Sequence, residues 1–247
     1  MANTGNPVLA PESWQATAPV FLGRSLSESE LEAFAIYERL LLEWNQKFNL
    51  TSITDPQEIR IKHFLDSLSA LPLLGNLNGL QLADVGTGAG LPGIVLKIIF
   101  QEMRLTLVDS VAKKLKFCEA VIQTLDLKGC ETIHERAELL AKLPTRRESF
   151  DVVTARAVAR LPILSEYLLP LLKVGGRMIA YKGETGAEEA QDAANAITIL
   201  GGAPAQVHTV SLPTLSDRRY LLLIKKMKPT PVEFPRTSAQ IKAHPLA

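Results

Sequence analysis

The sequence is poor in cysteine and histidine, with two cysteines and four histidines among 247 residues. Cys118 and Cys130 fall in a helix-like and a strand-like run, so we expect reduced core thiols of a cytoplasmic protein. The histidines are scattered along the chain, and neither residue type has the spacing of metal ligands. We therefore expect neither a disulfide framework nor a metal site.

Long apolar runs are also missing. No stretch is long and apolar enough to span a membrane, and the first residues lack the pattern of a signal peptide. We therefore expect a cytoplasmic protein without a membrane partner. Apolar residues still make up 47% of the chain, which is enough for the core of one large α/β domain, with or without an appendage.

A strong net charge is absent, because the formal value is only +1, but the charge is unevenly distributed. Residues 1–90 carry ten acidic and five basic side chains, whereas residues 218–247 carry seven basic side chains and one acid, Glu233. A basic end of this kind could meet phosphates. The alternative is a solvated tail without a partner.

What the sequence does contain is a glycine-rich stretch at residues 80–93, around which the rest of the chain is organised. It opens with apolar residues suited to a buried parallel strand, continues through Gly86, Gly88, Gly90 and Gly93, and leads into an apolar helical run. Strand, glycine turn and helix in this order are typical of a nucleotide-binding first crossover.

Two cofactors compete for this loop. The last three glycines satisfy the dinucleotide spacing G-x-G-x-x-G. An earlier start, from Asp84 and Gly86, gives Asp-x-Gly-x-Gly-x-Gly, which resembles the first motif of methyltransferases that use S-adenosylmethionine (SAM). Asp109 ends the next predicted strand, where a carboxylate could accept the ribose hydroxyls of either cofactor. An ordinary tight turn beside a solvated aspartate is the third interpretation.

Residues 25–75 read as a helical extension placed before the sheet. Capping residues at Ser27 and Asp55 begin two helices. Aromatic residues recur along one face of the first helix, and we expect them to pack against the sheet domain rather than to stack on bases. His63 and Asp66 share a face of the second helix, where we favour a structural role at the border of a site.

After the glycine loop, strands and helices alternate, which predicts a parallel sheet with right-handed crossovers. A helix over 162–172 is expected to be capped by Gly175 and Gly176. The last two strands, at 205–212 and 219–225, are too close for a crossover helix and should form an antiparallel hairpin. The predicted fold class is therefore α/β: a seven-strand, Rossmann-like SAM-dependent methyltransferase sheet with a terminal antiparallel hairpin and an N-terminal helical extension.

We accordingly expect four parts in the chain. They are a mobile leader at 1–24, the helical extension at 25–75, a SAM-dependent methyltransferase domain at 76–228 and a basic C-terminal tail at 229–247.

At this point the residues resemble one family closely, the bacterial 16S ribosomal RNA guanine-N7 methyltransferases, also called glucose-inhibited division protein B. The likeness covers about residues 27–240. It is carried by Trp44-Asn45-x-x-Phe48-Asn49-Leu50-Thr51, His63-x-x-Asp66-Ser67-Leu68, the glycine loop at 84–93, Asp109-Ser110-x-x-Lys113-Lys114, Arg136-Ala137-Glu138, Arg156-Ala157, Tyr181-Lys182-Gly183 and the ending at 230–236. Two departures are Lys114, where arginine is common, and the lack of a usual glycine in 237–246.

The resemblance implies SAM as the cofactor, 16S ribosomal RNA or the small ribosomal subunit as the partner, and a monomer. The implied cofactor-binding residues are Gly86, Gly88, Leu91, Asp109, Ala137, Glu138 and Arg156. Arg156, Lys182 and Arg219 are the implied contacts for the RNA or its target guanine. Guanine N7 has a free lone pair at neutral pH, so we expect catalysis by positioning, without a general base.

The sequence lacks the motifs that two other kinds of nucleic-acid methylation require. No Asn-Pro-Pro-aromatic motif follows the fourth predicted strand, and no cysteine ends the fourth or fifth, so methylation of an exocyclic amine or of cytosine C5 is not expected. Three alternatives remain open: a small-molecule methyltransferase, an NAD-dependent oxidoreductase, and an RNA-binding module with a vestigial cofactor site.

Overall fold

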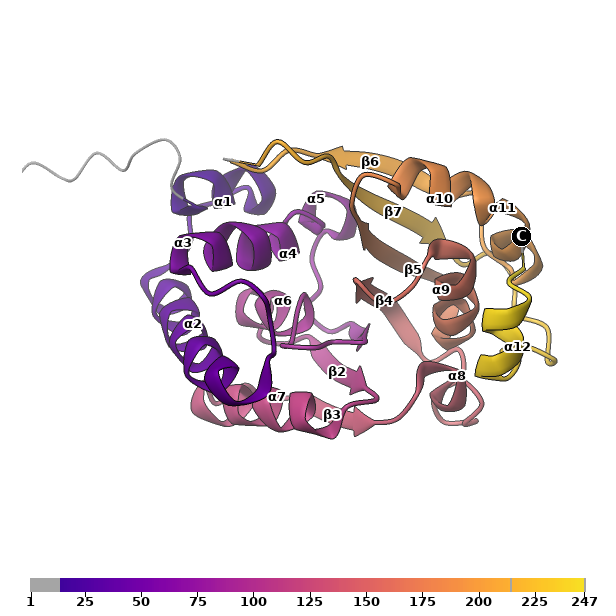
Figure 1. The fold of residues 1–247 in the computed structure, drawn as a ribbon, viewed down its shortest axis with the longest axis horizontal. Helices are drawn as coiled ribbons and strands as arrows, with labels where there is room; N and C mark the ends of the chain where they lie inside the picture. Colours follow the sequence, from indigo (N-terminus) through magenta and orange to yellow (C-terminus); the bar gives the residue numbers. More distant parts are fainter. Residues whose placement is uncertain (1–13, 214, 247) are drawn as a thin grey trace, which may run out of the picture.

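The computed structural model describes residues 14–213 and 215–246, which form a 7-stranded sheet flanked by helices (Figure 1). The strand order is β3-β2-β1-β4-β5-β7-β6. Strands β1 to β5 run parallel, and β7 is antiparallel to both of its neighbours, β5 and β6. The strands are β1 (Gln81–Val85), β2 (Arg104–Asp109), β3 (Cys130–His134), β4 (Phe150–Arg156), β5 (Leu172–Lys182), β6 (Gln206–Val210) and β7 (Arg219–Lys225). The predicted fold class, including the terminal hairpin, is confirmed.

Helices cover both faces of the sheet. One layer contains α1 (Trp14–Leu22), α2 (Glu28–Phe48), α3 (Pro56–Ile59), the π-helical turn η1 (Arg60–Leu65), α4 (Asp66–Leu68), α5 (Leu71–Leu74), α6 (Gly93–Ile99) and α7 (Ala112–Thr124). The other contains α8 (Ala137–Leu140), α9 (Leu161–Leu168), the 3₁₀ turn η2 (Leu169–Leu171), α10 (Gly186–Asp192), α11 (Ala194–Ile199) and α12 (Ser238–Ala243).

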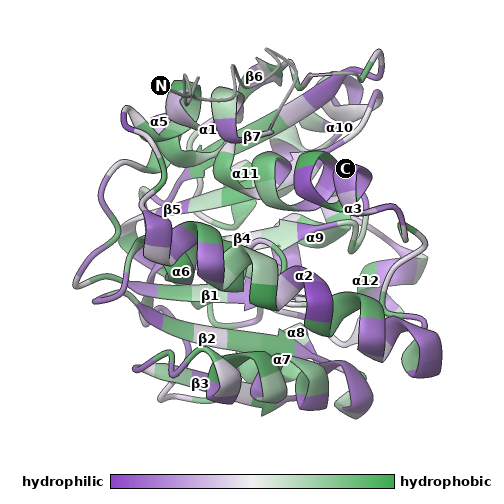
Figure 2. Ribbon diagram, turned by 90° about the vertical axis from the view of Figure 1, so that its left-hand side faces the viewer, coloured by the Kyte–Doolittle hydropathy of each residue, from purple (hydrophilic) through white to green (hydrophobic). Residues whose placement is uncertain are grey.

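The strands are apolar on both sides because both faces are covered. In β1, Leu82 is buried in the core beneath α1 to α7, while its neighbour Ala83 is buried in the core beneath α8 to α12. In β5, Ile179 and Ala180 divide in the same way. Figure 2 shows the result as mostly hydrophobic strands flanked by helices that carry their polar residues outward.

The aromatic residues of the N-terminal helices pack into the core, as expected, and the Tyr37 ring reaches that of Phe117 in α7, with centroids 6.2 Å apart. Helix α2 begins at a capping box in which the Glu30 amide donates to Ser27 Oγ at 3.2 Å. Phe34 and Tyr37 are buried, with ring centroids 5.1 and 5.3 Å from that of Phe64. These rings are therefore core residues, and none of the three is free to stack on a base.

The expected leader at 1–24 differs from the structure in its second half. Residues 1–13 lie outside the described residues, but Trp14–Leu22 forms helix α1. The Trp14 ring is buried and meets the Phe34 ring edge-on, with centroids 5.2 Å apart. Burial of this large ring against α2 is a tertiary contact that the local sequence did not reveal.

The predicted glycine cap at Gly175 and Gly176 is wrong. Helix α9 ends at Leu168, and both glycines lie inside β5. A Cβ on Gly176 would approach the backbone oxygen of Asp151 to 3.0 Å, so the close pairing of β5 with β4 requires glycine there.

The basic segment at 229–247 is packed against the domain over its described part, to residue 246. The Arg236 guanidinium pairs with the fully buried carboxylate of Glu166 at 2.7 Å. Arg147 donates to the backbone oxygens of Thr230, Pro231 and Phe234 at 2.6 to 3.1 Å. Two of the basic side chains around this segment therefore hold it in place.

Candidate functional site

The glycine loop after β1 is held open by a buried aspartate. Asp84 Oδ2 accepts hydrogen bonds from Thr87 Oγ1 at 2.6 Å and from the Gly93 amide at 3.0 Å, and Oδ1 accepts from Thr154 at 3.1 Å. Burial raises the pKa of the Asp84 carboxyl, and these hydrogen bonds oppose the rise. Asp84 therefore shapes the loop from beneath, with its carboxylate oxygens turned into the protein.

The loop is also tied to the N-terminal helices. The Tyr37 hydroxyl of α2 donates to the backbone oxygen of Ala89. Gly86 and Gly88 have φ values of 69° and 59°, which glycine adopts without the strain that other residues incur. The helical extension is thus part of the support for this loop.

Asp109, at the end of β2, lies against the loop. Its side chain is 6% exposed, and its two oxygens accept from the amides of Gly88 and Val111, each at 2.9 Å. Each carboxylate oxygen retains a second lone pair, because an ionised carboxylate has about four acceptor positions. The group is therefore oriented by the backbone and still able to accept from a ligand.

A cavity of about 330 Å³ opens over these residues. Four of the seven predicted cofactor residues line it: Gly86, Asp109, Ala137 and Glu138. Gly88 borders it through the hydrogen bond that its backbone amide donates to Asp109. Leu91 is buried in the core and does not appear in the wall, and Arg156 lies in a neighbouring cavity. The volume and the carboxylates suit an adenosine-like cofactor.

The C-terminal segment also reaches this first cavity, a contact that no sequence motif indicated. Glu138 accepts from Arg136 Nε at 2.6 Å, and the same guanidinium donates to Ser238 Oγ of α12 at 2.6 Å. Helix α12 then contributes Lys242 to the cavity lining.

A second cavity, of about 580 Å³, adjoins the first. Val158 and Ala159, in the loop after β4, line both cavities. Val158 packs so closely on Gly86 that a Cβ on this glycine would lie 2.4 Å from Val158 Cγ2. Only glycine at position 86 therefore leaves room for the partition between the two cavities.

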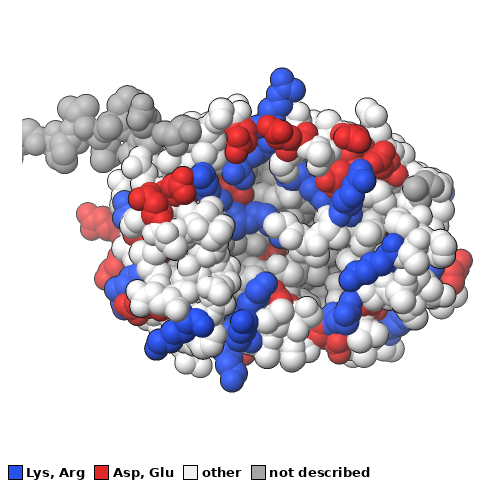
Figure 3. Space-filling model, in the orientation of Figure 1, with Lys and Arg blue, Asp and Glu red and all other residues white. Residues whose placement is uncertain are grey.

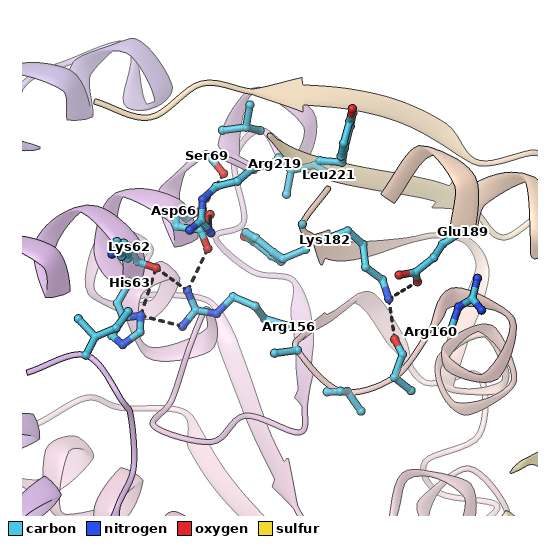
Figure 4. A pocket seen from close by; sticks show the side chains of 18 residues that line it. Lys62, His63, Asp66, Ser69, Arg156, Arg160, Lys182, Glu189, Arg219 and Leu221 are labelled. Carbon is cyan, nitrogen blue, oxygen red and sulfur yellow. Dashed lines mark hydrogen bonds and ion pairs between the residues drawn. The ribbon is translucent and has the colours of Figure 1, made fainter. Parts of the chain in front are cut away.

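The second cavity is organised around one aspartate and two arginines (Figure 4). Arg156 Nη1 lies 2.9 Å from Asp66 Oδ2, and Arg219 Nη1 lies 3.3 Å from Asp66 Oδ1. Arg156 also donates to the backbone oxygen of Lys62 and lies 3.4 Å from His63 Nδ1. Residues from η1, α4, β4 and β7 thus meet at one point.

His63 is held as a neutral ring in this cluster. Burial, reinforced by the neighbouring Arg156 guanidinium, lowers the pKa of His63 to about 4. Its Nε2 lies 2.8 Å from Thr51 Oγ1. This pairing fixes the ring at the border of the cavity and agrees with the structural role expected from its helix position.

Lys182 lines the cavity but has little freedom to meet RNA. Its ammonium donates to Glu189 Oε2 at 2.6 Å and to the backbone oxygen of Ala159 at 2.5 Å, and its side chain is 10% exposed. The Lys182 ammonium thereby holds the loop that separates the cavities. Arg219 is the more open of the two, with 25% of its side chain exposed.

Lysine and arginine side chains gather around the central hollow of the face that Figure 3 shows. Lys62 and Arg160 line the second cavity with 26% and 62% of their side chains exposed, and we call these two residues the basic rim. Within residues 14–213 and 215–246, no group of three or more histidine, cysteine, aspartate or glutamate residues is arranged to hold a metal ion. No helix in the same part of the chain has the length and hydrophobicity needed to cross a membrane.

Comparison with known proteins gives a consistent result. The model of the GidB family, described as rRNA small subunit methyltransferase G, matches residues 30–220. The chain is 47% identical over 225 residues to the ribosomal RNA small subunit methyltransferase G of Desulfitobacterium hafniense (strain Y51), covering 91% of this chain and 93% of the relative. It is 46% identical to the protein of that name from Bacillus cytotoxicus (strain DSM 22905 / CIP 110041 / 391-98 / NVH 391-98), covering 87% and 90%.

Solved structures show the same fold at low sequence identity. A SAM-dependent methyltransferase from Aquifex aeolicus matches with a TM-score of 0.51 and 16% identity, covering 71% of this chain and 96% of the other. A SAM-dependent O-methyltransferase from Thermotoga maritima matches with a TM-score of 0.52 and 14% identity, covering 77% and 72%. At these identities, the two matches support the fold and say nothing about the substrate.

Proposed function

The chain belongs to the rRNA small subunit methyltransferase G family, and from this premise we infer that it methylates N7 of a guanine in 16S ribosomal RNA. Family membership makes it a SAM-dependent ribosomal RNA methyltransferase and rules out the dinucleotide alternative for the glycine loop. The choice of guanine N7 is our proposal, and it rests on the pair of adjoining cavities.

The two cavities suit a reaction between a held cofactor and a separate base. The first presents Gly86 and Asp109, and the second presents Arg156 and Arg219 across the shared wall of Val158 and Ala159. When bound, SAM supplies an electrophilic methyl group on a sulfonium sulfur. We propose that the first cavity holds this cofactor and that the second takes the guanine.

The proposed roles in the first cavity follow from the backbone contacts. Asp109, oriented by two amides, accepts the ribose hydroxyls of the cofactor. Ala137 and Glu138 line the adenine edge. Gly86 and Gly88 let the backbone approach the ligand, and Leu91 supports the loop from the core.

Guanine N7 carries no proton to remove, so its methylation needs no general base. His63, whose pKa is lowered to about 4, is a weak base and is held by its neighbours. The residues therefore act by holding the base in place and excluding water. Positioning of this kind can contribute roughly 7–11 kcal/mol to lowering a barrier.

We further propose that Arg219 and the basic rim contact the RNA, and that Lys182 acts indirectly by holding Ala159. The sequence suggested a direct RNA contact for Lys182, but its ammonium is paired with Glu189 and its side chain is only 10% exposed. Lys62 and Arg160 also form ion pairs, but their side chains are 26% and 62% exposed. We also propose that a monomer is the active form. We propose a cytoplasmic location, in keeping with a ribosomal RNA substrate.

Transfer of labelled methyl groups tests the proposed function. Purified protein is incubated with labelled SAM and total RNA from cells that lack the enzyme, and the RNA is digested to nucleosides. Label in 7-methylguanosine from the small-subunit RNA is expected. Label in another nucleoside, or on a small molecule alone, would contradict guanine N7, and RNA binding without any transfer would favour a vestigial cofactor site.

A further inference from the structure

Asp66 is an acidic group of the second cavity that the proposed roles leave unused. It is 4% exposed and lies in the cavity wall, where Oδ2 accepts from Arg156 and Oδ1 from Arg219. Each oxygen keeps one lone pair for a further donor. The two guanidinium partners therefore leave part of this carboxylate's capacity to accept hydrogen bonds unused.

The other carboxylate of this cavity, Glu189, is more fully engaged. It accepts from Lys182, from the Leu161 amide and from Thr185 Oγ1, at 2.6 to 2.9 Å. Both lone pairs of Oε2 are taken by the first two donors. Of the two acids, Asp66 is therefore the better acceptor for a ligand that presents two donors side by side.

Arg156 can donate further hydrogen bonds to a ligand. Its guanidinium makes three contacts, to the Lys62 backbone oxygen, to Asp66 Oδ2 and to His63 Nδ1. Arginine carries five N–H groups, so donors remain for a ligand oxygen. Arg156 also directly precedes the loop with Val158 and Ala159 that borders the first cavity.

The groups therefore follow an order. The loop with Val158 and Ala159 lies beside the cofactor cavity, Arg156 directly precedes this loop, and the Arg156 guanidinium donates to Asp66, the pair that Figure 4 labels. The rim of guanine has the matching order: N7, then the acceptor O6, then the donors N1–H and N2–H₂. A guanine with N7 at the partition would place O6 at Arg156 and its two donors at Asp66.

Resting on the proposed function, we propose that Asp66 reads the Watson–Crick edge of an unpaired target guanine, with Arg156 reading O6. The major groove of an RNA helix is too deep and narrow to admit side chains, so the base must be unstacked to reach this cavity. Adenine would face Arg156 with a donor and Asp66 with an acceptor. Both mismatches leave buried polar groups unpaired, which hydrogen-bonding sites reject strongly.

The same contact acts on the rate of the reaction. Methylation places positive charge on the purine ring, which makes N1–H and N2–H₂ stronger donors. Their hydrogen bonds to the Asp66 carboxylate are then stronger in the transition state than in the bound substrate. Interactions that strengthen in this way raise kcat rather than only lowering KM.

The test replaces single groups on both partners. The methylated position is mapped with wild-type protein, and RNA is then assembled with guanosine or inosine at that position, since inosine lacks only the N2 amino group. Transfer is measured for the wild type, for Asp66→Asn and for Glu131→Gln. Glu131 is a matched control because it also pairs with an arginine, Arg146 at 2.6 Å, outside both cavities.

The wild type and Glu131→Gln should prefer guanosine over inosine by about 10- to 100-fold, the effect of leaving a buried charged acceptor unpaired. Asp66→Asn should lower kcat on guanosine and reduce that preference to near one, while its SAM affinity stays close to the wild type. An undiminished preference in Asp66→Asn would overturn the inference and leave the proposed function intact. Absence of 7-methylguanosine with wild-type protein would instead contradict the proposed function itself.

Discussion

The two cavities are built in different ways. The walls of the first come largely from residues that directly follow consecutive strands: Gly86 after β1, Asp109 at the end of β2, and Ala137 and Glu138 after β3. The centre of the second joins Asp66, Arg156 and Arg219, which are 90 and 153 positions apart in the two ion pairs. Backbone geometry shapes one site, and paired side chains assemble the other.

This difference has a physical consequence for substitutions. In the first cavity, Asp109 is oriented by amides that remain whatever the neighbouring side chains are. In the second, each charged group depends on another charged side chain, so removing one leaves its partner buried and less compensated. A substitution of one charged residue in the second cavity should therefore also affect the residues that pair with it.

Arg156→Ala should give the largest difference between the functions of the two cavities. It removes the donor proposed for the base and one partner of Asp66, so we expect methyl transfer to fall by about 100- to 1,000-fold and stability by about 1–3 kcal/mol. SAM affinity, measured by calorimetry, should stay within a few-fold of the wild type. A large loss of SAM affinity would instead place Arg156 in the cofactor site, as the sequence resemblance suggested.

The partition itself is tested by Gly86→Ala. A Cβ there meets Val158 Cγ2 at 2.4 Å and also requires a φ of 69°, so we expect a loss of about 2–4 kcal/mol together with weaker SAM binding. Chemical denaturation and SAM titration measure the two effects.

Gly79→Ala is the matched control, because Gly79 has a φ of +79° with no atom within 4 Å of a Cβ. It should show only the backbone cost, about 1 kcal/mol. Combining Gly86→Ala with Val158→Ala should recover part of the loss. Equal losses in the free energy of unfolding for Gly79→Ala and Gly86→Ala would show that Val158 does not press on the loop.

The pH dependence of stability should report on the second cavity through His63. Its pKa is about 4 in the folded protein and near 6.5 when unfolded, so the unfolded chain binds more protons between these values. Stability should therefore fall as the pH drops from 6.5 to 4, by roughly 3 kcal/mol from this group. Urea denaturation at both pH values should show that additional loss in the wild type and not in His63→Gln.

The smallest effect is expected for Arg219→Ala. Its side chain is 25% exposed and its ion pair with Asp66 is long, at 3.3 Å, so stability should change little. RNA affinity at low salt should weaken several-fold, with SAM affinity unchanged. The slope of log affinity against log salt concentration should become shallower by the amount expected for about one phosphate contact. Unchanged RNA affinity would remove Arg219 from the RNA-binding surface.

Several elements were predictable because their signals are local. The glycine loop, the carboxylate at Asp109 and the antiparallel hairpin of β6 and β7 each depend on a few neighbouring residues, and the structure has them in place. The cap at Gly175 was wrong because the same residue type suits a helix end and an irregular strand. Only pairing with β4 distinguishes the two.

The sequence by itself determined the order of strands and helices, the glycine turn and the acid that faces it, because hydrophobic periodicity and backbone preference act over a few residues. The tertiary structure alone decided that Asp66 pairs with Arg156 and Arg219, that Lys182 holds Ala159, and that α12 contributes Lys242 to the first cavity. The local sequence around a charged residue does not indicate which distant residue will become its partner. Folding brings them into a poorly solvated space, where a buried charge is stable only beside an opposite charge or a hydrogen-bonding group.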